Sequence, residues 1–268
     1  MFALDGNTIL TVLVVRIARL FDRTTARAFK TFLGYQDLVR SAVFAPDGKT
    51  ILTASYDKTA RLFDTRTARE IKRFEGHQDW VRSAVFAPDG KSILTASNDK
   101  TARLFDTRTA REIKRFEGHQ GMVMIAVFAP DGKTILTASY DKTVRLFDTR
   151  TAREIKRFEG HQDWVMSAVF APDGKTILTA SDDKTARLFD TKTAREIKRF
   201  EGHQDWVRSA VFAPDGKTIL TASDDNTARL FDTRTAREVK RFEGHQGWVR
   251  SAVFAPDGKT ILTASADG

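Results

Sequence analysis

The sequence predicts an all-β protein built from copies of one unit of four short strands. Two observations support this: a strict internal repeat, and short β-rich segments separated by turn signals. The triplet Gly-His-Gln begins at Gly76, Gly118, Gly160, Gly202 and Gly244, always 42 residues apart. We therefore expect two parts: residues 17–268 as six whole repeats, and residues 1–16 as a surplus, worn partial copy.

The copy that runs from Gly76 to Glu117 shows the four expected strands. They are residues 80–86, 92–97, 101–106 and 112–116. Pro88 and Gly90 predict a turn between the first two, because proline fixes φ and glycine accepts a positive φ. Residues 98–100 predict a tight turn, and residues 107–110 predict a polar corner. No segment carries a helical apolar stripe long enough to compete with this interpretation.

Composition excludes several classes of protein. The chain has 268 residues, of which 41% are hydrophobic, so it can build a core and is not wholly disordered. It has 0 cysteines, which excludes disulfides, thiolate zinc sites and a cysteine nucleophile and fits the cytoplasm. The net charge of +9 hints at an acidic partner.

No membrane or targeting segment is expected. The longest apolar stretch, residues 9–15, is far shorter than the roughly 20 residues that span a bilayer. The N-terminus lacks the basic start and the small-residue cleavage site of a signal peptide.

The repeat resembles that of the WD40 family of β-propellers. The matching residues are the pair Gly76-His77, the FAPDGK turn, the turn Ser97-Asn98-Asp99, and Leu104-Phe105-Asp106 where the family has Trp-Asp. The resemblance covers the whole chain and implies a closed β-propeller of four-stranded antiparallel blades. Fold alone says little about function, because one fold hosts many roles.

The resemblance also implies a buried hydrogen-bond network in each blade. Phe105 and its equivalents have no ring N–H, so the network should shrink to a histidine, a serine and an aspartate. The expected sets are His77, Ser97, Asp99; His119, Ser139, Asp141; His161, Ser181, Asp183; His203, Ser223, Asp225; and His245, Ser265, Asp267. The N-terminal copy has Leu13 and Val15 in place of serine and aspartate, and Tyr35 replaces histidine in the next.

In the family, strands from both chain ends usually share one blade. Six blades result if residues 247–254 and 260–265 pair with residues 17–22 and 26–32. Residues 8–15 must then be displaced, disordered or added elsewhere. The alternatives are seven blades with incomplete end blades, or a piece of a longer array. We expect a monomeric ring. The alternative is an oligomer in which chains associate through the surplus N-terminal strand.

Serine, histidine and aspartate are also the residue types of a nucleophilic triad. A catalytic set is built once per active site, however, whereas this one recurs in each copy. Mutually satisfied buried polar groups explain the pattern better. One histidine per repeat gives no metal-ligand spacing, and no glycine-rich phosphate loop is present. We expect no enzyme, no cofactor and no metal site.

The most informative positions differ between otherwise near-identical copies. They form three columns: Leu38, Trp80, Met122, Trp164, Trp206 and Trp248; Arg40, Arg82, Met124, Met166, Arg208 and Arg250; and Tyr56, Asn98, Tyr140, Asp182, Asp224 and Ala266. The resemblance places these columns on the face around the central channel, which the family uses for binding. Tryptophan and arginine are enriched at binding hot spots. The simpler interpretation is that the tryptophans only cap the core.

Three functional hypotheses remain open. The first is a non-catalytic scaffold that binds a protein or peptide partner on the Trp/Arg face. The second is nucleic-acid or anionic-surface binding through a basic rim that includes Arg111, Lys114 and Arg115. Even spreading of that charge over all copies favours a role in preventing strand-edge pairing instead. The third is an idle or artificial repeat array.

Overall fold

The predicted all-β fold with repeated four-stranded sheets is confirmed. The computed structural model describes residues 8–12, 16–22, 24–25 and 27–267. All regular secondary-structure elements in these ranges are β-strands. In the repeat from Gly76 the strands are β8 (Val81–Phe86), β9 (Ser92–Ser97), β10 (Ala102–Asp106) and β11 (Glu112–Phe116). Each agrees with the sequence prediction to within one residue at its ends.

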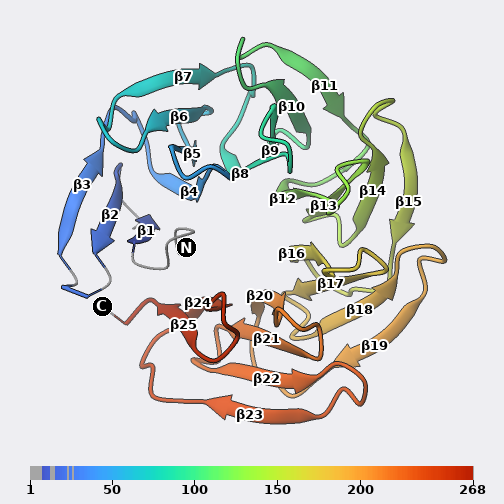
Figure 1. Ribbon diagram of the computed structural model, residues 1–268. Coiled ribbons are helices and arrows are strands. Elements are labelled where there is room, and N and C mark those ends of the chain that lie inside the picture. The colour runs from blue at the N-terminus through green and yellow to red at the C-terminus, as the bar shows by residue number, and fades with distance from the viewer. Residues whose placement is uncertain (1–7, 13–15, 23, 26, 268) are drawn as a thin grey trace. The chain divides into compact units, whose positions relative to one another are not determined.

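The chain forms two compact units. The first comprises Met1–Ile135 and Thr149–Arg153, and the second comprises Leu136–Asp148 and Glu154–Gly268. Besides β8–β11, the first unit contains β1 (Thr8–Val12), β2 (Ala18–Asp22), β3 (Ala28–Phe32), β4 (Val39–Phe44), β5 (Thr50–Ser55), β6 (Ala60–Asp64), β7 (Glu70–Phe74) and β12 (Val123–Phe128). Figure 1 shows β4 to β7 side by side in one sheet, in sequence order.

The second unit repeats this pattern. Its strands are β14 (Val144–Asp148), β15 (Glu154–Phe158), β16 (Val165–Phe170), β17 (Thr176–Ser181), β18 (Ala186–Asp190), β19 (Glu196–Phe200), β20 (Val207–Phe212), β21 (Thr218–Ser223), β22 (Ala228–Asp232), β23 (Glu238–Phe242), β24 (Val249–Phe254) and β25 (Ile261–Ser265). Strand β13 (Thr134–Ser139) spans the boundary between the units. The sheets β16–β19 and β20–β23 each have four antiparallel strands in sequence order.

Neighbouring sheets of one unit share a hydrophobic core. In the first unit, residues of β5 to β7 such as Leu52 and Phe74 pack against Val81 and Phe105 of the next sheet. The rings of Phe74 and Phe105 meet edge to face, 5.7 Å between centroids. One repeat buries only part of its apolar surface by itself, so the neighbouring copy has to cover the rest.

The two end sheets are incomplete. The first is β1-β2-β3, with Leu10 opposite Leu20, and the last is β24-β25. The structure thus adds residues 8–12 directly to β2, the position that the six-blade arrangement assigns to a C-terminal strand. This strand content fits the seven-blade alternative, while ring closure, blade number and the boundary after residue 16 stay predictions. Leu13 and Val15 lie outside the described residues.

The first strand of five repeats carries a β-bulge near its start. Val81 pairs with Ser97 and Ser83 pairs with Ala96, so Arg82 is an extra residue without a partner of its own. The same register shift occurs at Arg40, Met166, Arg208 and Arg250. A bulge bends the strand and redirects a side chain, and these bulges fall in one of the variable columns.

Candidate binding surface and buried network

In the copies that begin at Gly76, Gly160, Gly202 and Gly244, a hydrogen-bond chain links the Gly-His loop to the turn after the second strand. Nδ1 of His77 lies 2.7 Å from Oδ2 of Asp99, and Nε2 lies 2.7 Å from Oγ1 of Thr95. Ser97 lies one bond further along: its Oγ accepts from the backbone N–H of Asp99 and donates to the carbonyl of Asp79. Both imidazole nitrogens are therefore engaged, by the aspartate and by a threonine that the sequence analysis did not single out.

Three further copies have the same geometry. The pairs are His161 with Asp183 and Thr179, His203 with Asp225 and Thr221, and His245 with Asp267 and Thr263. Ser139, Ser181 and Ser223 accept from the backbone of Asp141, Asp183 and Asp225, Ser265 donates to Gly247, and His119 is buried. The last pair is the most open, because the side chains of His245 and Asp267 are 31% and 24% exposed.

A buried arginine extends the network, and sequence reasoning missed it. Arg103 is 3% exposed. Its Nη2 donates to Asp99 Oδ2 at 3.1 Å and its Nη1 to Glu112 Oε2 at 3.0 Å. The signal was present in the sequence, since an arginine inside the third strand precedes a glutamate by nine residues in each copy from Arg61 to Arg229.

Burial and hydrogen bonding determine the charge states in this network. Burial lowers the pKa of His77, outweighing the opposing hydrogen bond and charge of Asp99. Burial alone would raise the pKa of Asp99, but hydrogen bonds from His77 and Thr101 hold it well below its ordinary value. These shifts indicate that the His77 imidazole is neutral and that Asp99 is ionised. The Asp99 carboxylate also pairs with Arg103.

In the first full copy, Tyr35 stands in place of the histidine, and other groups complete the hydrogen bonds. The hydroxyl of Tyr35 donates to Oγ1 of Thr53 at 2.8 Å, the equivalent of the threonine that Nε2 contacts elsewhere. Asp57 is instead held by Arg61 and by the backbone N–H of Gln36. Tyr35 thus replaces the histidine toward the threonine.

In the first unit, the three variable columns meet in one cluster. The rings of Tyr56 and Trp80 stack at 4.2 Å with an interplanar angle of 5°. The Arg82 guanidinium lies 4.9 Å from the Tyr56 centroid and 5.1 Å from that of Trp80. Arg82 Nε donates to Asn98 Oδ1 at 2.7 Å, and Nη1 donates to the Tyr56 hydroxyl. Two consecutive repeats therefore build this cluster, and Trp80 stays 39% exposed.

In the second unit, an arginine lies between two aspartates. Arg208 Nε donates to Asp224 Oδ1 at 2.9 Å, Nη2 donates to Asp224 Oδ2, and Nη1 donates to Asp182 Oδ1 at 3.4 Å. The guanidinium lies 4.5 Å from the ring centroid of Trp206. Burial raises the pKa of Asp182 to about 6, against the opposing charge of Arg208.

Other positions of these columns have contacts or exposures of their own. Tyr140 and Trp164 stack at 4.0 Å, and Arg250 lies 4.6 Å from the Trp248 centroid. Leu38 receives the backbone N–H of Tyr56 at its carbonyl. Arg40 is exposed and Met122 is half-buried.

The basic rim is partly neutralised by acidic neighbours. Arg115 Nε lies 3.1 Å from Glu112 Oε1, and its Nη1 lies 3.9 Å from Glu117. Arg111 is exposed and Lys114 is half-buried. These ion pairs reduce the positive field that a phosphate backbone would meet.

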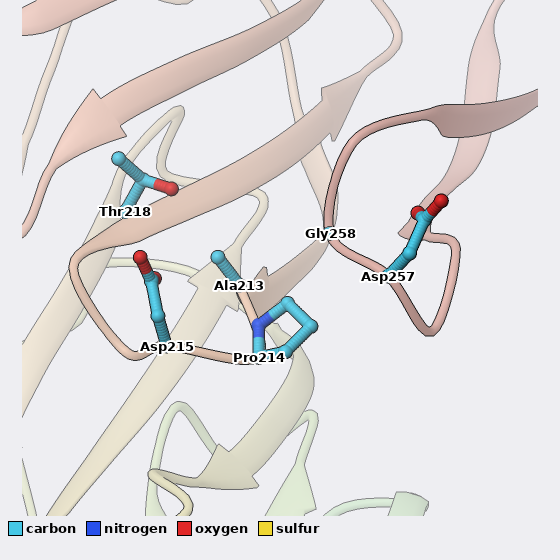
Figure 2. Close-up of a pocket in the computed structure, with 6 residues that line it drawn as sticks. All are labelled: Ala213, Pro214, Asp215, Thr218, Asp257 and Gly258. Carbon is cyan, nitrogen blue, oxygen red and sulfur yellow. The ribbon is translucent and has the colours of Figure 1, made fainter.

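Figure 2 shows a small hollow between the Pro-Asp-Gly turns of two neighbouring repeats in the second unit. Ala213, Pro214, Asp215, Thr218, Asp257 and Gly258 line it. Apart from Thr218, the first residue of β21, these residues belong to turns that recur in every repeat from Phe44 onward. Within the described part of the chain, no group of three or more histidine, aspartate and glutamate side chains is arranged to hold a metal, and no helix could span a membrane.

A family model described as the IFT122 first beta-propeller matches residues 1–268. The chain belongs to this β-propeller family. The match agrees with the WD40-type repeat and with the repeated antiparallel sheets. A comparison with curated proteins finds no match. Membership of a WD40-type propeller family suggests a protein-interaction scaffold and names neither a partner nor a binding face.

Proposed function

We propose that this propeller is a non-catalytic scaffold that binds a protein or peptide through the surface formed by its variable columns. We call this the aromatic–arginine surface and define it on each unit separately. It comprises Tyr56, Trp80, Arg82 and Asn98 in the first unit, and Tyr140, Trp164, Asp182, Trp206, Arg208, Asp224, Trp248 and Arg250 in the second. Leu38, Arg40 and Met122 are peripheral members by their place in the columns.

The exposure of its ordered tryptophans carries this proposal. Trp80, Trp164, Trp206 and Trp248 are 39%, 39%, 40% and 49% exposed. Each is nevertheless fixed by a neighbour, either a stacked tyrosine or an arginine over the ring. A large apolar ring that is held rigid and left open loses little conformational entropy when a partner covers it.

A direct test uses peptides selected for binding from a random displayed library. The double variant Trp206→Ala/Trp248→Ala should lose at least about tenfold in affinity, because two hot-spot rings are removed. The matched control is Ile197→Ala, an apolar side chain of similar exposure, 44%, on the outer strand β19. Equal binding by the double variant and the control would contradict the proposal, provided that thermal unfolding shows both folded.

The rim interpretation predicts a different result. Binding to nucleic acid would weaken steeply with salt and would be lost on neutralising Arg111, Lys114 and Arg115. We favour the aromatic–arginine surface because the rim arginine Arg115 is engaged by Glu112 and Glu117.

A further inference from the structure

Two clusters of the aromatic–arginine surface are equivalent by repeat position. Tyr56, Trp80, Arg82 and Asn98 in the first unit correspond to Tyr140, Trp164, Met166 and Asp182 in the second, each 84 residues later. Both clusters contain the same near-parallel stack of tyrosine on tryptophan, at 4.2 Å and 4.0 Å. They differ at the bulge residue and at the residue before the turn aspartate.

In two other repeats the bulge arginine hydrogen-bonds to the residue before the turn aspartate. Arg82 Nε donates to Asn98 Oδ1, and Arg208 donates to both oxygens of Asp224. In the repeat of Asp182, however, the bulge residue is Met166, which has no donor. Of the two equivalent clusters, the one in the second unit therefore contains a charged acceptor, Asp182, but no arginine at the bulge position.

The consequence is an orphaned carboxylate oxygen. The side chain of Asp182 is only 1% exposed. Its Oδ2 is therefore shielded from solvent, yet it has no hydrogen-bond partner. Its other oxygen receives Nη1 of Arg208 at 3.4 Å, and that arginine is already bidentate to Asp224. A buried acceptor without a partner is rare in folded proteins and calls for an explanation.

The surrounding charge favours a cation. Asp163, Asp205 and Asp224 all add negative potential at Asp182, and Arg208 is the opposing positive charge. Burial, the largest effect, raises the pKa of Asp182 to about 6, so at neutral pH the site holds an under-compensated carboxylate.

We infer that Asp182 is the acceptor for an arginine side chain of the bound partner, whose guanidinium takes the place that Arg82 has in the equivalent cluster. This rests on the proposed function, which it deepens by naming the partner's chemistry. The planar fork of arginine fits a carboxylate with two parallel hydrogen bonds, which lysine does not match. The stacked Tyr140 and Trp164 add a cation–π surface, as Tyr56 and Trp80 do for Arg82.

Met166 provides the means of entry. It is half-buried, and its unbranched side chain adapts to a new neighbour more readily than a branched or aromatic residue would. Trp164 is 39% exposed, so the cluster is reached from solvent at its edge.

The test uses N-acetyl-arginine-N-methylamide as the probe and its citrulline analogue as the uncharged control. Binding is followed by NMR at the methyl group of Met166, one of 4 methionines in the chain. The arginine probe should give a saturable shift, the citrulline probe none, and Asp182→Asn should weaken binding at least about tenfold. Glu201→Gln, which removes an equal charge at a rim glutamate 69% exposed, should leave it unchanged.

A second variant fills the site from within the chain. Met166→Arg should raise the unfolding temperature and abolish binding of the arginine probe, because its own guanidinium pairs with Asp182. Ile197→Arg adds the same charge on the outer strand β19 and should do neither. The inference fails if the arginine probe gives no shift, or if Asp182→Asn and Met166→Arg bind it like the wild type.

The two proposals fail separately. If the tryptophan variant loses its selected peptides but Asp182 has no effect on the arginine probe, the scaffold function stands and the arginine site does not. If the probe binds in an Asp182-dependent way while the tryptophan variant keeps its peptides, the arginine site stands and the proposed peptide surface does not.

Discussion

The imidazole of His203 lies between Asp225 and Thr221, with 2.7 Å from Nδ1 to the carboxylate and 2.7 Å from Nε2 to the hydroxyl. His245 makes the same two contacts at 2.8 Å but is 31% exposed, against 2% for His203. The repeat therefore presents one interaction in a buried and in an open setting.

This contrast predicts unequal costs for one substitution. His203→Ala should lower the free energy of unfolding by about 3 kcal/mol, because it leaves the buried Asp225 and Thr221 short of a partner. His245→Ala should cost less than about 1 kcal/mol, since water replaces the lost contacts. Urea denaturation of both variants measures the difference, and equal losses would show that burial does not determine the strength of this network.

Stability should fall as the solution becomes acidic. The pKa values of His77, His161 and His203 are lowered by burial in the folded state. A lowered pKa means that the unfolded chain binds the proton first, so stability is full above the ordinary value of 6.5 and is lost as the pH falls through the folded values. Asp99, Asp183 and Asp225, whose pKa values are also lowered, add to the loss below 3.8. Denaturation midpoints that stay constant between about pH 7.5 and 5 would contradict this.

The contribution of Asp182 to stability changes with pH in the opposite direction. Burial raises its pKa to about 6, above the ordinary 3.8, so its contribution is fully present below 3.8 and is lost as the pH rises through about 6. Asp182→Asn should therefore stabilise the fold by about 1–2 kcal/mol near pH 7.5 and have little effect near pH 4. Thermal unfolding at the two pH values checks this, and a variant that is less stable at the higher pH would refute it.

The buried arginine should matter more than its exposed neighbour. Arg103 and Arg115 both pair with Glu112, but their side chains are 4% and 44% exposed. Arg103→Met should cost about 3–5 kcal/mol, because it leaves Asp99 and Glu112 without their buried cation. Arg115→Met should cost no more than about 1 kcal/mol. The comparison of the two denaturation curves decides, and similar losses would contradict the prediction.

Gly202 is required by space as well as by backbone angle. Gly202 and Gly244 both have φ of +124°, but a Cβ at Gly202 would lie 2.8 Å from Arg229 Nη1, whereas nothing lies within 4 Å at Gly244. Gly202→Ala should therefore be more destabilising than Gly244→Ala by at least about 1 kcal/mol, since the backbone strain is shared and the clash is not. Equal effects in a thermal unfolding experiment would show that Arg229 moves aside at no cost.

Local patterns accounted for most of the fold. The alternation in residues 112–116 and the turn at Pro88 and Gly90 predicted β11 and the turn between β8 and β9, because both depend on neighbouring residues only. The resemblance of the Gly-His and Ser-x-Asp motifs to those of the WD40 family singled out His77 and Asp99, whose side chains lie 2.7 Å apart. Thr95 and Arg103 were missed, since strand periodicity does not say which polar side chain is buried by the next sheet.

The sequence by itself determined the repeat, its strands and the columns that vary, because these follow from period, turn chemistry and composition. Only the tertiary structure decided how the columns meet. Tyr56 stacks on Trp80 of the following repeat, and Arg208 reaches back to Asp182, across distances that no local pattern encodes. Met166 and Asp182 looked like ordinary variation until packing placed an acceptor where its repeat supplies no donor. Contacts between repeats depend on sheet packing and on the bulge that redirects each side chain.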